Sequence, residues 1–413
     1  MKNIRKTLTY DVLVAGGGVA GVAAAVEAAR CGKKVALIEK TVQLGGLATI
    51  GLVNYFVPMC NGQGVQIEKG MAEEFLRLAI KHGYDTVPED WKSGEPGFGN
   101  TQQRLRSMYS APIFSLVLCK LLKDHNVDLM FDTIVTDAEV KDGHICGIYI
   151  FNKSGYAYCE ADMFIDATGD ADILHYAGVP TVTAGNYHIY NGYYTDLERC
   201  QNAIDNNDIA LLVRDIFANN ANARGDGHPE GMKTWDGTNG DDVTNYLITN
   251  QLDLFDKIKD DDRKTRDITM LPAMCQFRTT RRIDGEYTLT EDDAYRHFED
   301  SVCAICDCDR RNFLFEIPYR AMIRKGFDNV ISVGRCVSAE GHAWTVVRVI
   351  PPAILTGQAA GAAVSQALDN KCAVTDIDVS VLQAKLEKEN VMIHFDDSLI
   401  PSDVTVGETT SVE

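Results

Sequence analysis

The chain of 413 residues lacks a long uninterrupted apolar run, and no stretch reaches the roughly 20 apolar residues that a membrane-spanning helix requires. Basic residues are also scarce, because 40 lysines and arginines face 59 aspartates and glutamates and leave a net charge of -19. Such a charge repels phosphate backbones and anionic membrane surfaces. We therefore expect neither nucleic acid nor a membrane among the partners of this protein.

The twelve cysteines lack the spacing of a disulfide framework or of a metal site. A chain of this length buries a large core without disulfide bonds, so a reducing, cytoplasmic setting is expected. Cys303, Cys306 and Cys308 are close in sequence, but no second Cys-x-x-Cys pair accompanies them. A capping box at Thr290 and Asp293 predicts a helix that continues to about Cys303, with thiols near its end. No metal ligand set is predicted.

The strongest positive signal lies near the N-terminus, where an apolar strand leads into Gly16, Gly18 and Gly21 and a helix follows. Gly16 allows a tight turn, Gly18 allows the backbone to approach a pyrophosphate, and Gly21 allows the helix to pack on the strand. A second strand at 33–39 ends in Glu39, where a carboxylate binds a ribose hydroxyl. A glycine turn in an ordinary α/β protein is the alternative, but the full pattern predicts a dinucleotide site.

Later segments repeat the combination of a strand and small residues. Gly45, Gly46 and Thr49 follow the second strand, and an apolar strand ends in Ala167-Thr168-Gly169-Asp170. A third strand at 329–333 ends in Gly334 and Arg335. It leads to a helix that begins with prolines and carries Gly357 and Gly361 on one face, so another segment is expected to pack closely there.

Periodicity predicts the intervening elements. Helices are expected at 69–82 and 110–124, a strand at 127–131, a β-meander from 133–140 and 144–151, and an irregular loop at 88–101.

Together these segments, which span residues 10–368 and include the stretch 281–287, resemble the FAD-dependent oxidoreductase family within the class built on the glutathione-reductase-like flavin fold. The resemblance implies a Rossmann-like, doubly wound parallel FAD-binding domain with a β-meander, formed by residues 1–183 and 326–375. It implies an inserted α+β substrate or cap domain at 184–325. A C-terminal helix and an acidic tail are expected at 376–413.

The resemblance also implies how FAD binds. The adenosine is expected near Glu39 and Val135, and the isoalloxazine near Gly45, Gly46 and Gly334. The other expected cofactor contacts are Gly16, Gly18, Val19, Ala20, Gly21, Lys40, Thr49, Ala167, Thr168, Gly169, Asp170 and Arg335.

Candidate catalytic residues are His342 and Arg348, in a loop expected at 338–348 between two segments assigned to the flavin. A histidine there exchanges a proton at neutral pH, although a purely structural role is the alternative. Arg278 and Arg282 are candidates for binding an anionic or carbonyl-bearing substrate, because a guanidinium binds a carboxylate in bidentate fashion. Each arginine equally well pairs with one of the surplus carboxylates.

The chain lacks a second glycine fingerprint for NADPH, so the flavin is expected to exchange electrons with the substrate or with an external donor or acceptor. The predicted function is hydride transfer between flavin and a small oxygen-rich organic substrate, as in dehydrogenation of an alcohol or a related C–H bond. One alternative is a flavin-dependent reductase of an activated C=C bond in a carboxylate substrate. Another is a flavin-carrying electron-transfer subunit. The oligomeric state stays open.

Overall fold

The centre of the protein is a mixed seven-stranded sheet in the order β5-β2-β1-β8-β7-β6, with β18 also paired to β8. The computed structural model describes residues 4–87, 106–222 and 224–402, and the loop expected at 88–101 lies outside this part. The strands are β1 (Ile4–Ala15), β2 (Val35–Ile38), β5 (Asp128–Met130), β6 (Ile134–Lys141), β7 (His144–Asn152), β8 (Gly155–Asp166) and β18 (Val330–Ser332).

The long strand β8 forms both parallel and antiparallel pairs with its neighbours. It runs parallel to β1 and β18, and β1 and β2 continue the parallel part towards β5. Its first half pairs antiparallel with β7, which pairs antiparallel with β6. These pairings confirm the mixed α/β class, the strand predicted near 127–131 and the β-meander.

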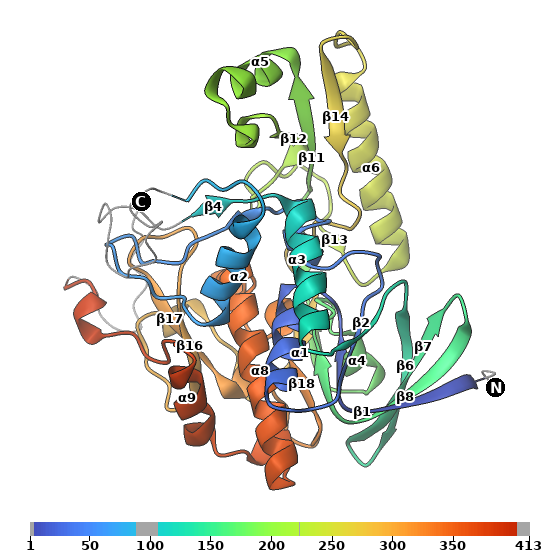
Figure 1. The fold of residues 1–413 in the computed structure, drawn as a ribbon, viewed down its shortest axis with the longest axis vertical. Coiled ribbons are helices and arrows are strands. Elements are labelled where there is room, and N and C mark those ends of the chain that lie inside the picture. Colours follow the sequence, from blue (N-terminus) through green and yellow to red (C-terminus); the bar gives the residue numbers. More distant parts are fainter. Residues whose placement is uncertain (1–3, 88–105, 223, 403–413) are drawn as a thin grey trace.

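Alternation along β1 gives the sheet two hydrophobic cores, because successive side chains of a strand point to opposite faces. Val12 and Val14 belong to one buried cluster, and Leu13 and Ala15 belong to the other. The first cluster is covered by α1 (Val19–Arg30), α2 (Met71–Lys81), α3 (Ala111–Asp124) and α8 (Ile350–Asn370), which lie on one side of the sheet in Figure 1. The second is covered by α4 (Asp172–Tyr176) and the meander. Helices α2 and α3 confirm those predicted at 69–82 and 110–124.

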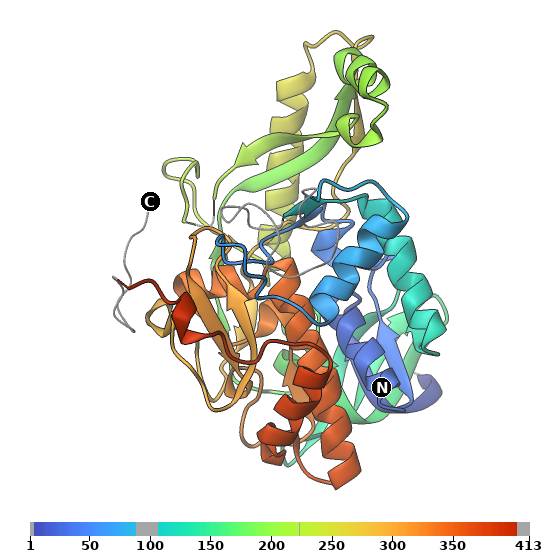
Figure 2. The ribbon, with the colours of Figure 1, turned by 60° about the vertical axis from the view of Figure 1, so that its left-hand side comes forward.

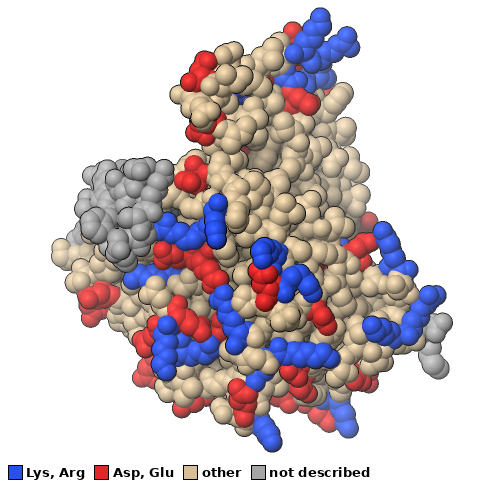
Figure 3. All heavy atoms as spheres, in the orientation of Figure 1, with Lys and Arg blue, Asp and Glu red and all other residues tan. Residues whose placement is uncertain are grey.

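A smaller sheet projects from this body (Figures 1 and 2). In it, β11 (Ile189–Asp196) pairs with β12 (Arg214–Asn220) and β14 (Arg266–Met270), beside α6 (Gly240–Ile258) and α5 (Leu197–Asn206). On the face in Figure 3, most of the projecting part is uncharged, whereas acidic and basic side chains alternate over the body.

The short elements around the body are β3 (Tyr55–Phe56), β4 (Ser107–Met108), β9 (Thr181–Thr183), β10 (Gly185–Asn186), β13 (Trp235–Asp236), β15 (Arg281–Ile283), β16 (Ser301–Cys306), β17 (Leu314–Pro318), α7 (Gly341–Val347) and α9 (Val379–Lys388). Strands β16 and β17 pair with each other and share the hydrophobic cluster of α8. The domain boundaries at 184 and 325 stay a prediction.

Two local predictions are wrong. The capping box at Thr290 is present, but it begins only a short 3-10 turn at Glu291–Asp293, and Ser301–Cys306 form strand β16 instead of a helix. All six residues of this strand are buried, and a short buried apolar run has no periodicity that separates strand from helix. The loop expected at 338–348 contains helix α7.

Among the described residues, no single helix has the length and apolar character to cross a membrane. Helices α7 and α8 pass such a test only as a pair, bent by 76°.

The contact between α1 and α8 confirms the close packing expected at Gly357 and Gly361. A Cβ atom on Gly357 would lie 2.1 Å from the carbonyl oxygen of Ala20, and one on Gly361 would lie 2.5 Å from that of Ala24. The backbones of the two helices therefore meet without room for a methyl group. Because α1 begins at the glycine turn, this contact also positions the turn.

We predict that Gly357→Ala lowers the free energy of unfolding by about 1–3 kcal/mol, because the added methyl group forces the two backbones apart. Denaturant unfolding followed by circular dichroism measures the change. Gly240→Ala is the matched control, since Gly240 begins α6 and a Cβ there meets nothing within 4 Å. Equal stability of the two variants would contradict the packing argument.

Candidate functional site

A cavity of about 350 Å³ lies at the carboxyl ends of β1, β2, β8 and β18. Ligands of parallel α/β sheets bind at this edge. The described residues that were expected to contact the cofactor and that line the cavity are Gly16, Gly18, Val19, Ala20, Glu39, Lys40, Gly45, Gly46, Val135, Ala167, Thr168, Gly169, Gly334 and Arg335. The structure thus brings together segments that are far apart in the sequence.

The glycine turn between β1 and α1 is closely packed at Gly16 and open at Gly18. Gly16 has a φ of +102°, and a Cβ on it would lie 2.2 Å from the carbonyl oxygen of Ala167, so β1 and β8 meet directly at this point. A Cβ on Gly18, in contrast, would meet nothing within 4 Å. Gly18 caps α1 without a side-chain hydrogen bond, so the first N–H groups of the helix are available to an anion such as a pyrophosphate.

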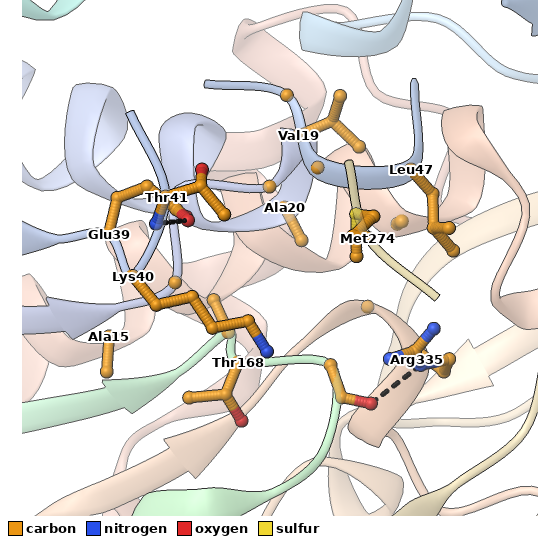
Figure 4. A pocket seen from close by; sticks show the side chains of 18 of the residues that line it. Ala15, Val19, Ala20, Glu39, Lys40, Thr41, Leu47, Thr168, Met274 and Arg335 are labelled. Carbon is orange, nitrogen blue, oxygen red and sulfur yellow. Dashed lines mark hydrogen bonds between the residues drawn. The ribbon is translucent and has the colours of Figure 1, made fainter. Parts of the chain in front are cut away.

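Glu39, at the end of β2, binds the glycine turn through its side chain. Its side chain is buried, and its carboxylate accepts hydrogen bonds from the backbone N–H of Gly17 at 2.6 Å and of Thr41 at 2.7 Å. Each oxygen keeps a further lone pair, so the fixed carboxylate fits a ribose diol. Figure 4 shows Lys40 extending from the same strand end across the cavity towards Thr168.

Three of the expected cofactor contacts do not line the cavity, namely Gly21, Thr49 and Asp170. Each of them instead contacts a residue or segment that lines it. A Cβ on Gly21 would lie 1.9 Å from the Gly16 oxygen, so Gly21 permits the approach of helix and turn. The Thr49 hydroxyl donates to the Leu44 carbonyl and shapes the segment of Gly45.

Asp170 belongs to an ion-pair network beside the cavity. It contacts Arg335 Nη2 at 2.8 Å and Lys40 Nζ at 3.5 Å. Burial by itself would raise the pKa of Asp170, but the two cations outweigh burial and lower it. Arg335 also donates to the backbone oxygens of Gly169 and Phe277, each at 2.6 Å, so it joins β8 to the segment before β15.

The cavity contains one further cation, Arg348, at the C-terminal end of α7. Its Nε is buried and has no hydrogen-bond partner among the described residues. Burial, together with repulsion from Arg278 and Arg335, lowers the pKa of Arg348 to about 10, although Cys308 and Asp309 act in the opposite direction. Mutually repelling, desolvated guanidinium groups are stabilised by an anion. Met274, Leu47 and Ile50, which sequence reasoning missed, supply an apolar wall.

His342 lies in the first turn of α7 and is not among the residues that line the cavity. Its Nε2 lies 2.7 Å from Oδ2 of the buried Asp307. Burial would raise the pKa of Asp307, but the contact with His342, the N–H of Asp309 and Arg310 lower it to about 2. Asp307 could not be recognised from the sequence, because its contact with His342 forms only through tertiary structure.

The two candidate arginines of the insert also lie outside the cavity lining. Arg278 donates from Nη1 to the Ala221 oxygen at 2.7 Å, and its charge acts on Arg348. Arg282 is buried, donates to Ser338 Oγ at 3.0 Å and lies over the ring of Trp344. These internal contacts favour a structural role for Arg282.

A family model described as FAD dependent oxidoreductase matches residues 11–223 and 251–386. The chain belongs to this family. It is therefore an FAD-dependent oxidoreductase, and its cofactor is FAD. The uncapped helix terminus, the open space at Gly18 and the fixed carboxylate of Glu39 fit a dinucleotide of this kind.

Solved structures of other proteins are similar to this one at low identity. A geranylgeranyl bacteriochlorophyll reductase-like protein from Thermoplasma acidophilum is 16% identical, with 95% of each chain covered and a TM-score of 0.42. The p-nitrophenol 4-monooxygenase from Pseudomonas putida DLL-E4 is 13% identical, with 95% of this chain and 91% of that chain covered and a TM-score of 0.45. No curated protein matches the chain.

We predict that Gly18→Val abolishes FAD binding without unfolding the protein. The backbone at Gly18 is extended, with φ of -65°, so valine is tolerated there, but its side chain would occupy the open space beside the helix terminus. Flavin absorbance per chain and the far-ultraviolet circular dichroism spectrum measure the two effects. A folded variant with a full complement of FAD would show that the dinucleotide binds elsewhere.

Proposed function

We propose that this enzyme transfers a hydride between FAD and a small oxygen-rich substrate that carries an anionic group, with a hydroxy acid as the favoured class. The observation that carries this proposal is the half-buried Arg348, which lines the cavity and whose buried Nε has no hydrogen-bond partner among the described residues. An unpaired buried charge is costly, and a carboxylate that binds it in bidentate fashion removes the cost. Met274 and Leu47 form an apolar wall in the same cavity.

Bound FAD supplies the two-electron acceptor or donor. Arg348 binds the carboxylate of the substrate and so orients the neighbouring carbon. Asp307 holds Nε2 of His342, which keeps the proton on that nitrogen and leaves Nδ1 as the acceptor. Nδ1 accepts the hydroxyl proton when the carbon-bound hydrogen leaves as hydride, and a carbonyl compound results.

This division of roles requires the substrate to extend from Arg348, which lines the cavity, towards His342, which lies outside the cavity lining at the other end of α7. The helix begins at Gly341 and ends at Val347, so the two residues are separated by about 9 Å along its axis. Arg278 strengthens the positive field at Arg348 without lining the cavity itself. The arginine is equally suited to the carboxylate of an unsaturated acid, so reduction of an activated C=C bond, with His342 delivering the proton, is the second candidate function.

The experiment that tests the substrate class is anaerobic bleaching of the flavin with hydroxy acids, neutral polyols, NADH and NADPH. We expect saturable bleaching by a hydroxy acid and slow, unsaturable bleaching by the pyridine nucleotides, because the chain has no second glycine fingerprint. Reoxidation of the reduced enzyme by unsaturated acids tests the second candidate.

Arg348→Ala is expected to raise the KM for the acidic substrate at least tenfold while FAD stays bound, and Arg348→Lys to restore part of the loss. Arg266→Ala is the control, since Arg266 pairs with Asp261 in the projecting part. Preferred bleaching by a neutral polyol that is unchanged in Arg348→Ala would overturn the assignment.

We further predict that His342→Ala retains FAD but slows flavin reduction roughly a hundredfold, the usual contribution of a positioned acid or base. Asp307→Asn leaves the imidazole in place without its charged partner, and it is expected to slow the same step and to shift its pH profile. Rapid-mixing absorbance across pH measures both variants. His144→Ala, which removes a surface histidine paired with Asp328, is the control. A wild-type rate and pH profile in His342→Ala would assign the proton to another group.

A further inference from the structure

Away from the FAD cavity, two histidines converge on one buried carboxylate. Nδ1 of His297 lies 2.6 Å from Oε1 of Glu316, and Nδ1 of His394 lies 3.0 Å from the same oxygen. The Glu316 side chain is fully buried, whereas the two imidazoles are about two-fifths exposed at 39% and 43%. None of the three residues lines the cavity.

From this geometry we propose that His297, Glu316 and His394 bind one divalent transition-metal ion of the zinc class, which fastens the C-terminal segment to strand β17. The donor set consists of two imidazole nitrogens and one carboxylate oxygen, and the three ligand atoms lie within 4.8 Å of one another. Imidazole favours zinc and its neighbours, whereas magnesium and calcium prefer oxygen ligands throughout. A water molecule completes the coordination on the exposed side.

Glu316 has no permanent cation beside it in the described part of the chain, because the two imidazoles carry charge only when they are protonated. A buried carboxylate is costly unless it is paired. In the described part of the chain, Glu316 contacts no lysine or arginine, and apart from the imidazoles it accepts a hydrogen bond only from the backbone N–H of Phe298, at 2.8 Å. Asp307, the other buried carboxylate that contacts a histidine, already has a permanent cation in Arg310.

The surroundings orient the first histidine as a ligand. Nε2 of His297 lies 2.8 Å from Oδ1 of Asp397, and its ring stacks on Phe395 with centroids 4.4 Å apart. A carboxylate that accepts from Nε2 fixes the proton there and leaves the Nδ1 lone pair for a metal, as is common for metal-bound histidines. Two bonds to a tetrahedral zinc separate ligand atoms by about 3.4 Å. From their present distances of 2.6 Å and 3.0 Å to Glu316 Oε1, the partly exposed imidazoles of His297 and His394 would therefore move outward by about 0.8 Å and about 0.4 Å.

The ion would join three segments that are distant in sequence. His297 precedes β16, Glu316 lies in β17, and His394 follows α9 in the stretch that runs along β16, where Ala304 N–H donates to the Met392 oxygen at 2.6 Å. Figure 2 shows this C-terminal stretch against the two strands. The ion therefore has a structural role in the body of the enzyme, separate from the redox site.

The test is isothermal titration of the FAD-loaded, EDTA-dialysed protein with zinc chloride and, separately, with magnesium chloride. We expect one zinc per chain and no saturable magnesium binding. His297→Ala and His394→Ala should each weaken zinc binding at least a hundredfold, and Asp397→Asn about ten- to hundredfold, because it removes only the orienting partner. His144→Ala controls for adventitious binding to surface histidines.

A second measurement is the thermal midpoint, which zinc should raise in the wild type and in His144→Ala but not in His394→Ala. Because His394 is partly exposed, its replacement should leave the fold intact, and an unchanged flavin content verifies this. Absence of saturable zinc binding by the wild type would overturn the proposal. Zinc binding that persists unchanged in both His297→Ala and His394→Ala would also overturn it.

Discussion

The direct contact of the β1–α1 turn with the end of β8 is the constraint on which the rest of the site depends. Gly16 approaches Ala167 so closely that no side chain fits between them, and Gly21 brings α1 against the same turn. Helix α1 also packs closely against α8 at Gly357 and Gly361. The helix terminus is thereby held at the edge of the sheet, where its unsatisfied N–H groups meet a ligand.

Helix α8 also contacts the segment that carries the residues proposed to act on substrate. The Thr356 hydroxyl accepts the backbone N–H of Gly334 at 3.0 Å, which ties the end of β18 to the helix. Gly334 leads to Arg335, and α7 then carries His342 and Arg348 back to the start of α8. The residues proposed to act on substrate are therefore attached to the helix that positions the dinucleotide turn, although they come from the last quarter of the chain.

The cofactor side of the site could be predicted from the sequence, because each of its requirements is local. Gly16, Gly18 and Glu39 are recognised by their distance from a strand or a helix start. The charged contacts could not be predicted in this way, since Asp307 meets His342, and Glu316 meets His297 and His394, only after β16 and β17 have packed against the body. The error at β16 has the same origin, because burial on both faces removes the alternation by which a strand is recognised.

The net charge of -19 excludes long-range attraction of polyanions, yet it does not oppose a small anion in the cavity. Exposed charges are screened beyond a Debye length of about 8 Å at physiological ionic strength. Arg348, Arg335 and Arg278 interact in a desolvated interior, where the same charges act more strongly because water is excluded. Asp170 forms an ion pair with Arg335. Arg348, in contrast, has an Nε without a hydrogen-bond partner among the described residues. The acidic surface is therefore compatible with the proposed carboxylate substrate, because exposed charges are screened over a short distance whereas Arg348 acts within the cavity.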